Sequence, residues 1–407
     1  MKIILIVLDG LGDALILALR NKTPLEAAKT PNLDWLARKG VCGLVKPWQM
    51  GSSKPASDTC HLALFGYDPK IYYLGRGPYE ASGIGMKLKK GDVALRTNFG
   101  TVDENLKIID RRAGRIENTQ SLVKAISKIR IKGVNILIKK SYGHRIVLVL
   151  RGKDISSAIT DGDPHKAGEK VRKIFPICIF GKCGERERGK AEFTAQVLNE
   201  FLEKAHHILK NHPLNKKRKK QKLLPANYLL VRGAGEVREI PSFKEKHGLK
   251  AGCIAGGGLY KGIGKILGMD LIKVKGATGF ADTNLKGKFL TAKKATRSHD
   301  FIFLHIKATD SLAEDGNYFG KKEFIERIDK DLKPLLKLKN TLIVVTGDHA
   351  TCSELKRHCS EPFPILIYCD RIKADTVKAF SEKACKKGKL GRIKQLYLMP
   401  KILLYNK

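Results

Sequence analysis

Four short apolar runs constrain the fold of this chain more than any other feature of its sequence. They cover residues 3–8, 301–306, 341–346 and 364–368. Runs that are apolar on both faces are typical of interior strands in a parallel sheet that helices cover on both sides. Helical patterns lie between them, at residues 30–38 and 321–338. This alternation predicts a doubly wound α/β domain with a mostly parallel sheet, built from both ends of the chain.

The middle of the chain has a different pattern. Mixed polarity predicts strands at 92–101, 107–110 and 141–150, and helical patterns occupy 119–131 and 191–209. A chain of 407 residues is also longer than a single hydrophobic core usually supports. We therefore expect a smaller α/β (α+β) domain at residues 73–240, inserted into a sheet domain made of residues 1–72 and 241–407.

Acidic residues follow three of the apolar runs. Asp9 follows the first, Asp310 the second, and Asp348 with His349 the third. Ligands bind beyond the carboxyl ends of the strands in an open parallel sheet, so these side chains are expected to meet there. One aspartate after a strand is more often a helix N-cap, but three acids beside a histidine favour a divalent metal site. His358 is a further candidate ligand.

Ser57 precedes an apolar stretch of helical character, and two interpretations of it stay open. As an N-cap it would only stabilise the helix. As a nucleophile, its hydroxyl would lie at the positive end of the helix dipole, which stabilises an alkoxide and binds phosphate oxygens. A metal ion at that oxygen would lower the hydroxyl pKa further.

Ordered motifs along nearly the whole chain resemble one enzyme family. They include Asp-Gly-Leu-Gly-Asp at 9–13 and Asp-Gly-Asp-Pro-His at 161–165, with others at 22–28, 30–34, 57–59, 65–69, 75–80, 110–115, 232–235, 257–264 and 346–349. In these motifs the chain is similar to the archaeal-type cofactor-independent phosphoglycerate mutases of the alkaline phosphatase superfamily. The resemblance implies an isomerase of glycolysis and gluconeogenesis with an alkaline-phosphatase-like fold. Such an enzyme interconverts 3-phosphoglycerate and 2-phosphoglycerate through a phosphoserine intermediate, with two divalent metals and without 2,3-bisphosphoglycerate.

The resemblance also implies roles for individual residues. Ser57 matches the nucleophile. The ligands of one metal would be Asp9, Ser57, Asp348 and His349, and those of the other Asp310, the residue at position 314 and His358. Manganese fits this mixed shell of oxygen and imidazole ligands best, with magnesium, cobalt or zinc as alternatives.

Position 314 departs from the family pattern, because Glu314 stands where a histidine ligand is expected. Glu314 lies four residues after Asp310, a spacing that places both side chains on one helical face. A carboxylate also ligates divalent ions, and its negative charge favours manganese or magnesium over zinc.

A cluster of arginines provides candidate groups for binding the substrate. Arg111, Arg112 and Arg115 surround Gly114, and guanidinium groups bind carboxylate and phosphate in a bidentate manner. A basic cluster is by default a solvated surface, and the family resemblance favours the substrate role here. Arg232 and Lys261 are further substrate-binding candidates, and Asp163 and His165 are the candidates for proton relay.

The charge of the chain leaves alternatives open. With 78 Lys+Arg against 40 Asp+Glu, the net charge of +38 favours phosphates on nucleic acid, lipid or a metabolite. The basic run at 216–222 would suit a nucleic-acid-binding protein, but no motif of that class is present, so no specific nucleic-acid partner is expected. A metal-dependent phosphohydrolase or another phosphomutase is the closer alternative, although the arginines, Asp163 and His165 have no obvious role in a simple phosphatase.

The nine cysteines and the apolar runs bear on the compartment. No cysteine spacing, including 178/183 and 352/359, is typical of a zinc site or a disulfide framework, which predicts a reducing cytoplasm. No apolar run reaches the length of a membrane span, so no membrane partner is expected. A monomer and a homo-oligomer both stay open.

Overall fold

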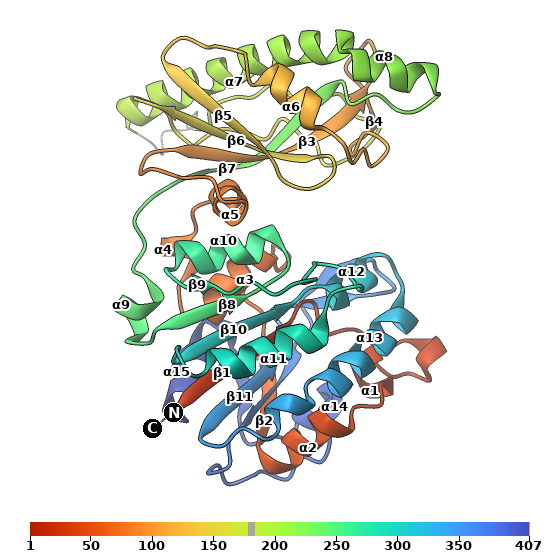
Figure 1. The fold of residues 1–407 in the computed structure, drawn as a ribbon, viewed down its shortest axis with the longest axis vertical. Coiled ribbons are helices and arrows are strands. Elements are labelled where there is room, and N and C mark those ends of the chain that lie inside the picture. Colours follow the sequence, from red (N-terminus) through yellow and green to blue (C-terminus); the bar gives the residue numbers. More distant parts are fainter. Residues whose placement is uncertain (178–183, 407) are drawn as a thin grey trace. The chain divides into compact units, whose positions relative to one another are not determined.

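The computed structural model of the chain describes residues 1–177 and 184–406. These residues form two compact units, which are described separately below (Figure 1). The larger unit contains Met1–Tyr73 and Ile240–Lys407, and the smaller unit contains Leu74–Glu239. Within the described residues, no helix is both long and apolar enough to cross a membrane.

The larger unit is built on an eight-stranded sheet with the order β15-β2-β14-β11-β1-β10-β8-β9. Its strands are β1 (Lys2–Leu8), β2 (Val41–Lys46), β8 (Ala251–Ile254), β9 (Asp270–Leu271), β10 (Phe301–Ile306), β11 (Thr341–Thr346), β14 (Phe363–Tyr368) and β15 (Gly391–Lys394). The predicted run at 3–8 forms β1, which pairs in parallel with β10 and β11. The run at 364–368 lies in β14, which is antiparallel to both β11 and β2. Its apolar pattern reports burial on both faces, which does not fix the strand direction.

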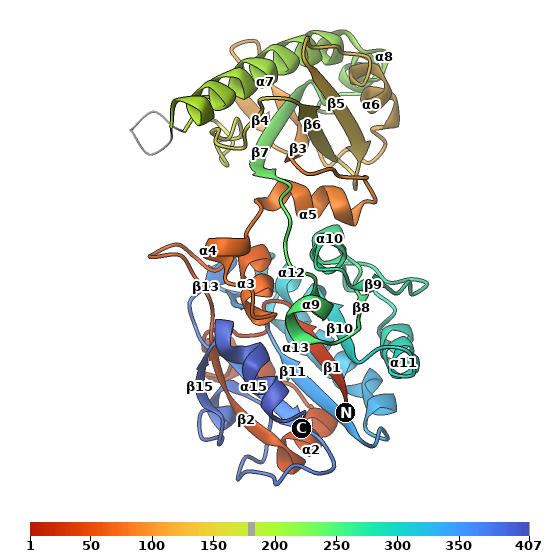
Figure 2. The ribbon, with the colours of Figure 1, turned by 90° about the vertical axis from the view of Figure 1, so that its left-hand side faces the viewer.

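Helices cover both faces of this sheet, which confirms the doubly wound α/β prediction (Figures 1 and 2). Leu33 of α2 (Pro31–Lys39), Phe289 of α11 (Leu285–Ala295) and Phe324 of α13 (Tyr318–Asp331) pack on one face in a single core cluster with Ile4 and Ile302. On the other face, Phe65 at the end of α3 (Ser57–Leu64) lies 4.9 Å from Phe303 between ring centroids. Alternate residues of the strands therefore point to two buried faces, as the continuous apolar runs require.

The helices of the larger unit begin with residues that favour helix starts. Thr23 caps α1 in a capping box with Glu26, and Pro31 is the first residue of α2. The α-helices are α1 (Pro24–Ala27), α2 (Pro31–Lys39), α3 (Ser57–Leu64), α4 (Pro69–Tyr72), α9 (Phe243–His247), α10 (Gly258–Ile266), α11 (Leu285–Ala295), α12 (Ala308–Glu314), α13 (Tyr318–Asp331), α14 (Glu382–Cys385) and α15 (Leu398–Leu404). Short 3-10 helices cover Leu17–Leu19, Lys333–Leu335 and Gln395–Tyr397, and a hairpin joins β12 (Ala350–Cys352) to β13 (Arg357–Cys359).

The smaller unit is an antiparallel sheet with helices on its two faces. The strands are β3 (Val93–Val102), β4 (Ile108–Asp110), β5 (Val134–Lys140), β6 (Arg145–Gly152) and β7 (Tyr228–Glu236), and the helices are α5 (Arg76–Gly83), α6 (Gln120–Ile126), α7 (Glu185–Asn211) and α8 (Pro213–Lys220). Phe201 of α7 and Leu122 of α6 pack with Leu148 on one face, and Ala81 of α5 packs with Val147 on the other. The sequence analysis anticipated β3, β4, β6, α6 and α7, and missed β5, β7, α5 and α8.

Candidate active site

The carboxylates that follow β1, β10 and β11 meet at one edge of the larger sheet. Asp9, Asp310 and Asp348 are fully buried, because the parallel pairing of these strands brings their carboxyl ends together. Two groups of ligand atoms result, and within each group the atoms lie within 4.8 Å of one another. One group contains Asp9, Asp348 and His349, and the other contains Asp310, His349 and His358. His349 belongs to both groups.

Ser57 is the first residue of α3 and reaches the same place. Its Oγ lies 3.2 Å from Nε2 of His349. The N-cap of the helix is Ala56, which removes the N-cap interpretation of Ser57. The hydroxyl is therefore directed at the metal-ligand groups instead of at the backbone of its own helix.

The oxygens of Asp9 and Asp348 are divided between protein donors and the interior of the site. Oδ2 of Asp9 lies 3.0 Å from Nε2 of His305, and Oδ1 of Asp348 accepts the backbone N–H of Gly10 at 3.0 Å. Oδ1 of Asp9 lies 3.5 Å from Nε2 of His349. Oδ2 of Asp348 is buried without a hydrogen-bond partner among the described residues. An orphaned buried oxygen beside a carboxylate, an imidazole and a hydroxyl fits the donor set of a divalent cation.

Burial and charge repulsion also favour a cation at this place. Burial, and next the nearby Asp9 carboxylate, raise the pKa of Asp348 to about 7. A bound divalent ion would compensate both effects.

Gly10 permits this close packing. It has a φ of 63°, and a Cβ built on it would lie 2.5 Å from Oγ1 of Thr351 and 2.8 Å from Cβ of Asp310. Only glycine therefore fits between the strand end and the ligands while donating its N–H to Asp348.

Lys307 is a member of this site that the sequence analysis did not single out. Its Nζ contacts a carboxylate oxygen of Asp310 and lies 3.4 Å from Oδ1 of Asp9. Burial alone would raise the pKa of Asp310, but the ammonium group of Lys307 outweighs it and holds that pKa well below its usual range. The sequence offered one signal for this contact, because Lys307 and Asp310 are three residues apart and residues with this spacing are neighbours on a helix.

A second cluster, in the smaller unit, contains both candidates for proton relay. Arg111 binds the buried carboxylate of Asp163 in a bidentate manner, with Nε–Oδ1 and Nη2–Oδ2 distances of 3.0 and 2.6 Å. Burial opposes ionisation of Asp163, but the bonds from Arg111 hold its pKa below the ordinary value. Nη1 of Arg232 lies 2.9 Å from Nδ1 of His165. The structure thus brings together four of the predicted residues.

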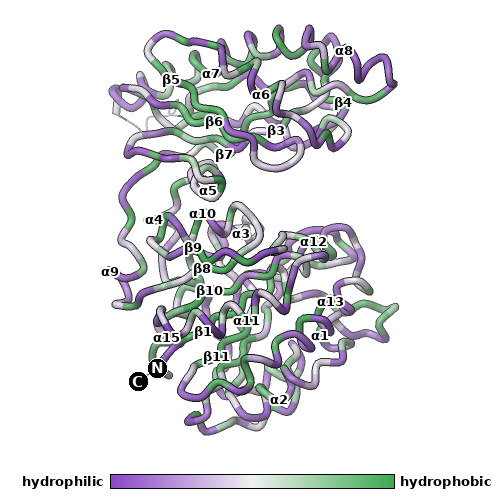
Figure 3. Tube along the Cα trace, in the orientation of Figure 1, coloured by the Kyte–Doolittle hydropathy of each residue, from purple (hydrophilic) through white to green (hydrophobic). Residues whose placement is uncertain are grey.

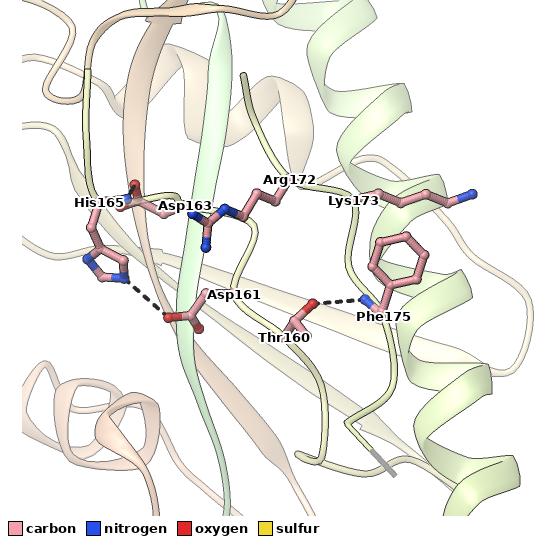
Figure 4. Close-up of a pocket in the computed structure, with 7 residues that line it drawn as sticks. All are labelled: Thr160, Asp161, Asp163, His165, Arg172, Lys173 and Phe175. Atoms are coloured by element: carbon pink, nitrogen blue, oxygen red, sulfur yellow. Dashed lines mark hydrogen bonds and ion pairs between the residues drawn. The ribbon is translucent and has the colours of Figure 1, made fainter. Parts of the chain in front are cut away.

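A cavity of about 390 Å³ adjoins Asp163 and His165. In Figure 4, His165 extends toward Asp161, and the distance from Nε2 to Oδ2 is 3.3 Å. Arg172, Lys173, Thr160 and Phe175 complete the lining. The cavity therefore combines cations with a carboxylate–imidazole pair.

The other predicted basic residues are placed differently. Arg112 and Arg115 are exposed, and no hydrogen bond or ion pair of their side chains is found within residues 1–177 and 184–406. Lys261 lies on α10, in the larger unit. Two further buried residues, Glu80 and Arg96, approach within 3.6 Å between Oε1 and Nη1.

Comparisons with known proteins identify the family. Residues 37–215 match the model of the 2,3-bisphosphoglycerate-independent phosphoglycerate mutases. A protein of that name from Archaeoglobus fulgidus is 45% identical, over 98% of this chain and 96% of the relative. The chain belongs to this family. A phosphoglycerate mutase of the same description from Methanococcus aeolicus is also 45% identical, over 99% of this chain and 97% of the relative.

Solved structures agree with the family assignment. The cofactor-independent phosphoglycerate mutase from Thermoplasma acidophilum is 40% identical, with a TM-score of 0.71 over 100% of both chains. A protein from Pyrococcus horikoshii is 33% identical, with a TM-score of 0.83 over 99% of this chain and 96% of the other. This mutase family consists of isomerases that transfer a phosphoryl group within one molecule, and the chain is an isomerase of this class.

Glu314 of this mutase lies outside both groups of ligand atoms. Its side chain is 52% exposed, and its Oε1 is 3.7 Å from Nε2 of His358. Burial, and next the charge of Asp310, raise the pKa of Glu314. Its role as a metal ligand stays a prediction.

The cysteine prediction is wrong for one pair. Cys352 and Cys359 form a disulfide across the β12–β13 hairpin, which also carries His358. The hairpin turn brings the two strands side by side, so a separation of seven residues becomes a cross-strand contact. Cys178 and Cys183 lie outside the described residues. Because this disulfide is present, the cysteines of the chain no longer argue for a reducing compartment.

Proposed function

We propose that this isomerase interconverts 3-phosphoglycerate and 2-phosphoglycerate without 2,3-bisphosphoglycerate, through a phosphoserine at Ser57. The observation that supports this most strongly is the 3.2 Å approach of the Ser57 hydroxyl to His349, the histidine that both ligand groups contain. A serine hydroxyl at a helix N-terminus is suited to attack a phosphoryl group and to bind its oxygens.

The larger unit would hold two divalent metals. Asp9, Ser57, Asp348 and His349 would hold one, and Asp310, Glu314 and His358 the other. When bound, the ions lower the pKa of the serine hydroxyl and neutralise phosphate charge in an in-line displacement. Manganese suits this mixture of carboxylate and imidazole donors best, and magnesium, cobalt and zinc are the alternatives.

The smaller unit would bind the glycerate part of the substrate. Arg111, Arg112, Arg115 and Arg232 would bind carboxylate and phosphate oxygens. Lys261 of the larger unit would contact a phosphoryl oxygen.

Proton relay is better suited to His165 than to Asp163. Asp163 is fully buried and bound by Arg111, which lowers its pKa and makes it a weak base. Nδ1 of His165 faces the guanidinium of Arg232, which can only donate, so Nδ1 is unprotonated. The lone pair of Nδ1 is thus taken by Arg232, and Nε2 carries the proton, 3.3 Å from Oδ2 of Asp161, so we propose that the ring exchanges a proton with the substrate through Nε2.

The proposal includes a cytoplasmic location, a small phosphorylated metabolite as partner, and no specific nucleic-acid or membrane partner. The location rests on where a phosphoglycerate is metabolised, because the Cys352–Cys359 disulfide means that the cysteines no longer support a reducing compartment. A homo-oligomer stays compatible with the proposal.

The test is conversion of 3-phosphoglycerate in the presence of manganese and without 2,3-bisphosphoglycerate, with enolase coupled to detect 2-phosphoglycerate. We expect turnover by the wild type and none by Ser57→Ala. Ser53→Ala is the matched control, since Ser53 is exposed and, among the described residues, hydrogen-bonds only to the nearby Met50. Full activity of Ser57→Ala would contradict the proposal. Phosphate release faster than isomerisation would favour a phosphohydrolase instead.

A further inference from the structure

The loop that carries Arg111, Arg112 and Arg115 has an unusual backbone. Ala113, Gly114 and Arg115 have φ values of 48°, 63° and 57°, so three successive residues lie in the left-handed region. Residues other than glycine adopt this region at a cost in free energy, and they keep it only where their surroundings hold it.

Asp110 holds the loop from inside. Its Oδ1 accepts the backbone N–H of Arg112 at 2.6 Å and that of Gly114 at 3.2 Å. The N–H of Arg115 then bonds to the carbonyl of Arg112 at 2.9 Å. These bonds shape the turn, and the bidentate bonds of Arg111 to Asp163 hold its first residue.

Arg218 holds the middle of the turn from outside. Its Nη2 donates to the carbonyl of Ala113 at 3.1 Å, and its Nε donates to the carbonyl of Leu224 at 2.8 Å. A Cβ built on Gly114 would lie 3.6 Å from this Nη2, which shows how closely the guanidinium lies against the turn. One planar side chain therefore joins two segments that are more than 100 residues apart.

Arg218 belongs to the basic run that the sequence analysis left without a role. The neighbouring Lys216, Lys217, Lys219 and Lys220 are exposed, and α8 is strongly hydrophilic in Figure 3. Arg218 is turned inward, and the fully buried Asn215 anchors the helix through bonds to the carbonyls of Leu209 and Ala226 at 2.8 and 2.9 Å. The run is thus an anchored helix with one arginine directed at the loop.

We propose that Arg218 is a positioning residue, which holds the 111–115 loop in the conformation that presents its arginines to the substrate. The inference rests on the proposed function, in which these arginines bind phosphoglycerate. A guanidinium donates from two fixed directions to two carbonyls, whereas a lysine ammonium presents a single flexible centre. The role is therefore specific to arginine.

The test compares Arg218→Met and Arg218→Lys with the control Lys219→Met, which removes a neighbouring exposed charge from the same helix. The first readout is hydrogen exchange of the amides of residues 114–116, which does not depend on activity. We expect exchange to become about tenfold faster in Arg218→Met, the effect of losing one hydrogen bond from a charged donor. Arg218→Lys should be intermediate, and the control should match the wild type.

The second readout separates KM from kcat for 3-phosphoglycerate at saturating manganese. We expect Arg218→Met to raise KM about tenfold with kcat within about twofold of the wild type. Arg115→Met should raise KM less in the Arg218→Met background than in the wild type, because both changes act on one loop. Unchanged exchange in a folded Arg218→Met variant would overturn the inference, as would an unchanged KM. If Arg111→Met and Arg115→Met both leave KM unchanged in the wild-type background, the proposed function of the loop fails, and the inference fails with it.

Discussion

His305 is expected to control metal affinity although it is not itself a predicted ligand. Its ring is fully buried, stacks on Tyr260 with centroids 3.5 Å apart, and places Nε2 3.0 Å from Oδ2 of Asp9. Burial lowers the pKa of His305 to about 3, so the ring is neutral. Nδ1 has no hydrogen-bond partner among the described residues, so the single proton belongs on Nε2, where it is donated to Asp9. This bond leaves Oδ1 of Asp9 to face the metal site.

The size of the effect follows from that bond. A hydrogen bond to a charged group contributes about 1.5–3 kcal/mol, and 1.36 kcal/mol corresponds to a tenfold change. Replacing His305 by leucine should therefore weaken divalent-metal binding about 10- to 100-fold, the range usual for partners of metal ligands. His305→Gln keeps an N–H donor and should recover most of the affinity.

The assay is calorimetric titration of the metal-free protein with manganese, which also counts the sites. His247→Leu is the matched control, because its ring bonds to the carbonyl of Phe65 at 2.9 Å and belongs to neither ligand group. Affinity of His305→Leu within twofold of the wild type would refute the reasoning. Equal losses in His305→Leu and His305→Gln would also refute it, since the donated proton would then be irrelevant.

Three further predictions concern stability and the hairpin. Burial raises the pKa of Glu382 to about 7, so the folded state retains a proton that the unfolded state loses near pH 4.5. Stability should therefore fall by about 3 kcal/mol between pH 4.5 and 7.5, and Glu382→Gln should remove this loss in urea unfolding at the two pH values. Lys321 is fully buried, and its Nζ bonds to Oδ2 of Asp13 at 2.8 Å. Lys321→Met should therefore lower the free energy of unfolding by about 3–5 kcal/mol in the same assay. Lys219→Met, which changes an exposed lysine, should leave it almost unchanged. Reducing the Cys352–Cys359 disulfide should weaken manganese binding several-fold, because the β12–β13 hairpin carries the predicted ligand His358. A Cys352→Ser/Cys359→Ser variant should bind manganese as weakly as the reduced wild type, and dithiothreitol should not change its affinity.

The carboxylate part of the site was predictable because local sequence patterns fix it. Asp9, Asp310 and Asp348 each lie within four residues after the end of an apolar strand, and parallel pairing places such positions at one edge of the sheet. The prediction needed the strands, which short apolar runs indicate, and the parallel pairing of β1 with β10 and β11, which the alternation of strands and helices indicates.

The arginine part depends on strand register, which short segments do not encode. Arg96 and Arg232 lie directly opposite each other on β3 and β7, and a slip of one residue would separate them. The pairing of β3 with β7 includes a register shift between Ala94 and Arg96, and no pattern in the sequence predicts this shift. Arg218 escaped notice for a similar reason, since its inward direction depends on how α8 packs and its sequence neighbours are all lysines.

The positions of a few charges explain more about this mutase than its net charge of +38. The larger unit gathers buried carboxylates that Lys307 only partly neutralises, which is an arrangement that requires cations. The smaller unit gathers Arg111 and Arg232 around one carboxylate, which leaves an excess of positive charge that suits an anion. A phosphoglycerate carries two anionic groups of different kinds, a phosphate suited to metal ions and a carboxylate suited to guanidinium groups. Taken separately, the buried carboxylates of the larger unit and the guanidinium groups of the smaller unit therefore each suit one of the two anionic groups of the proposed substrate.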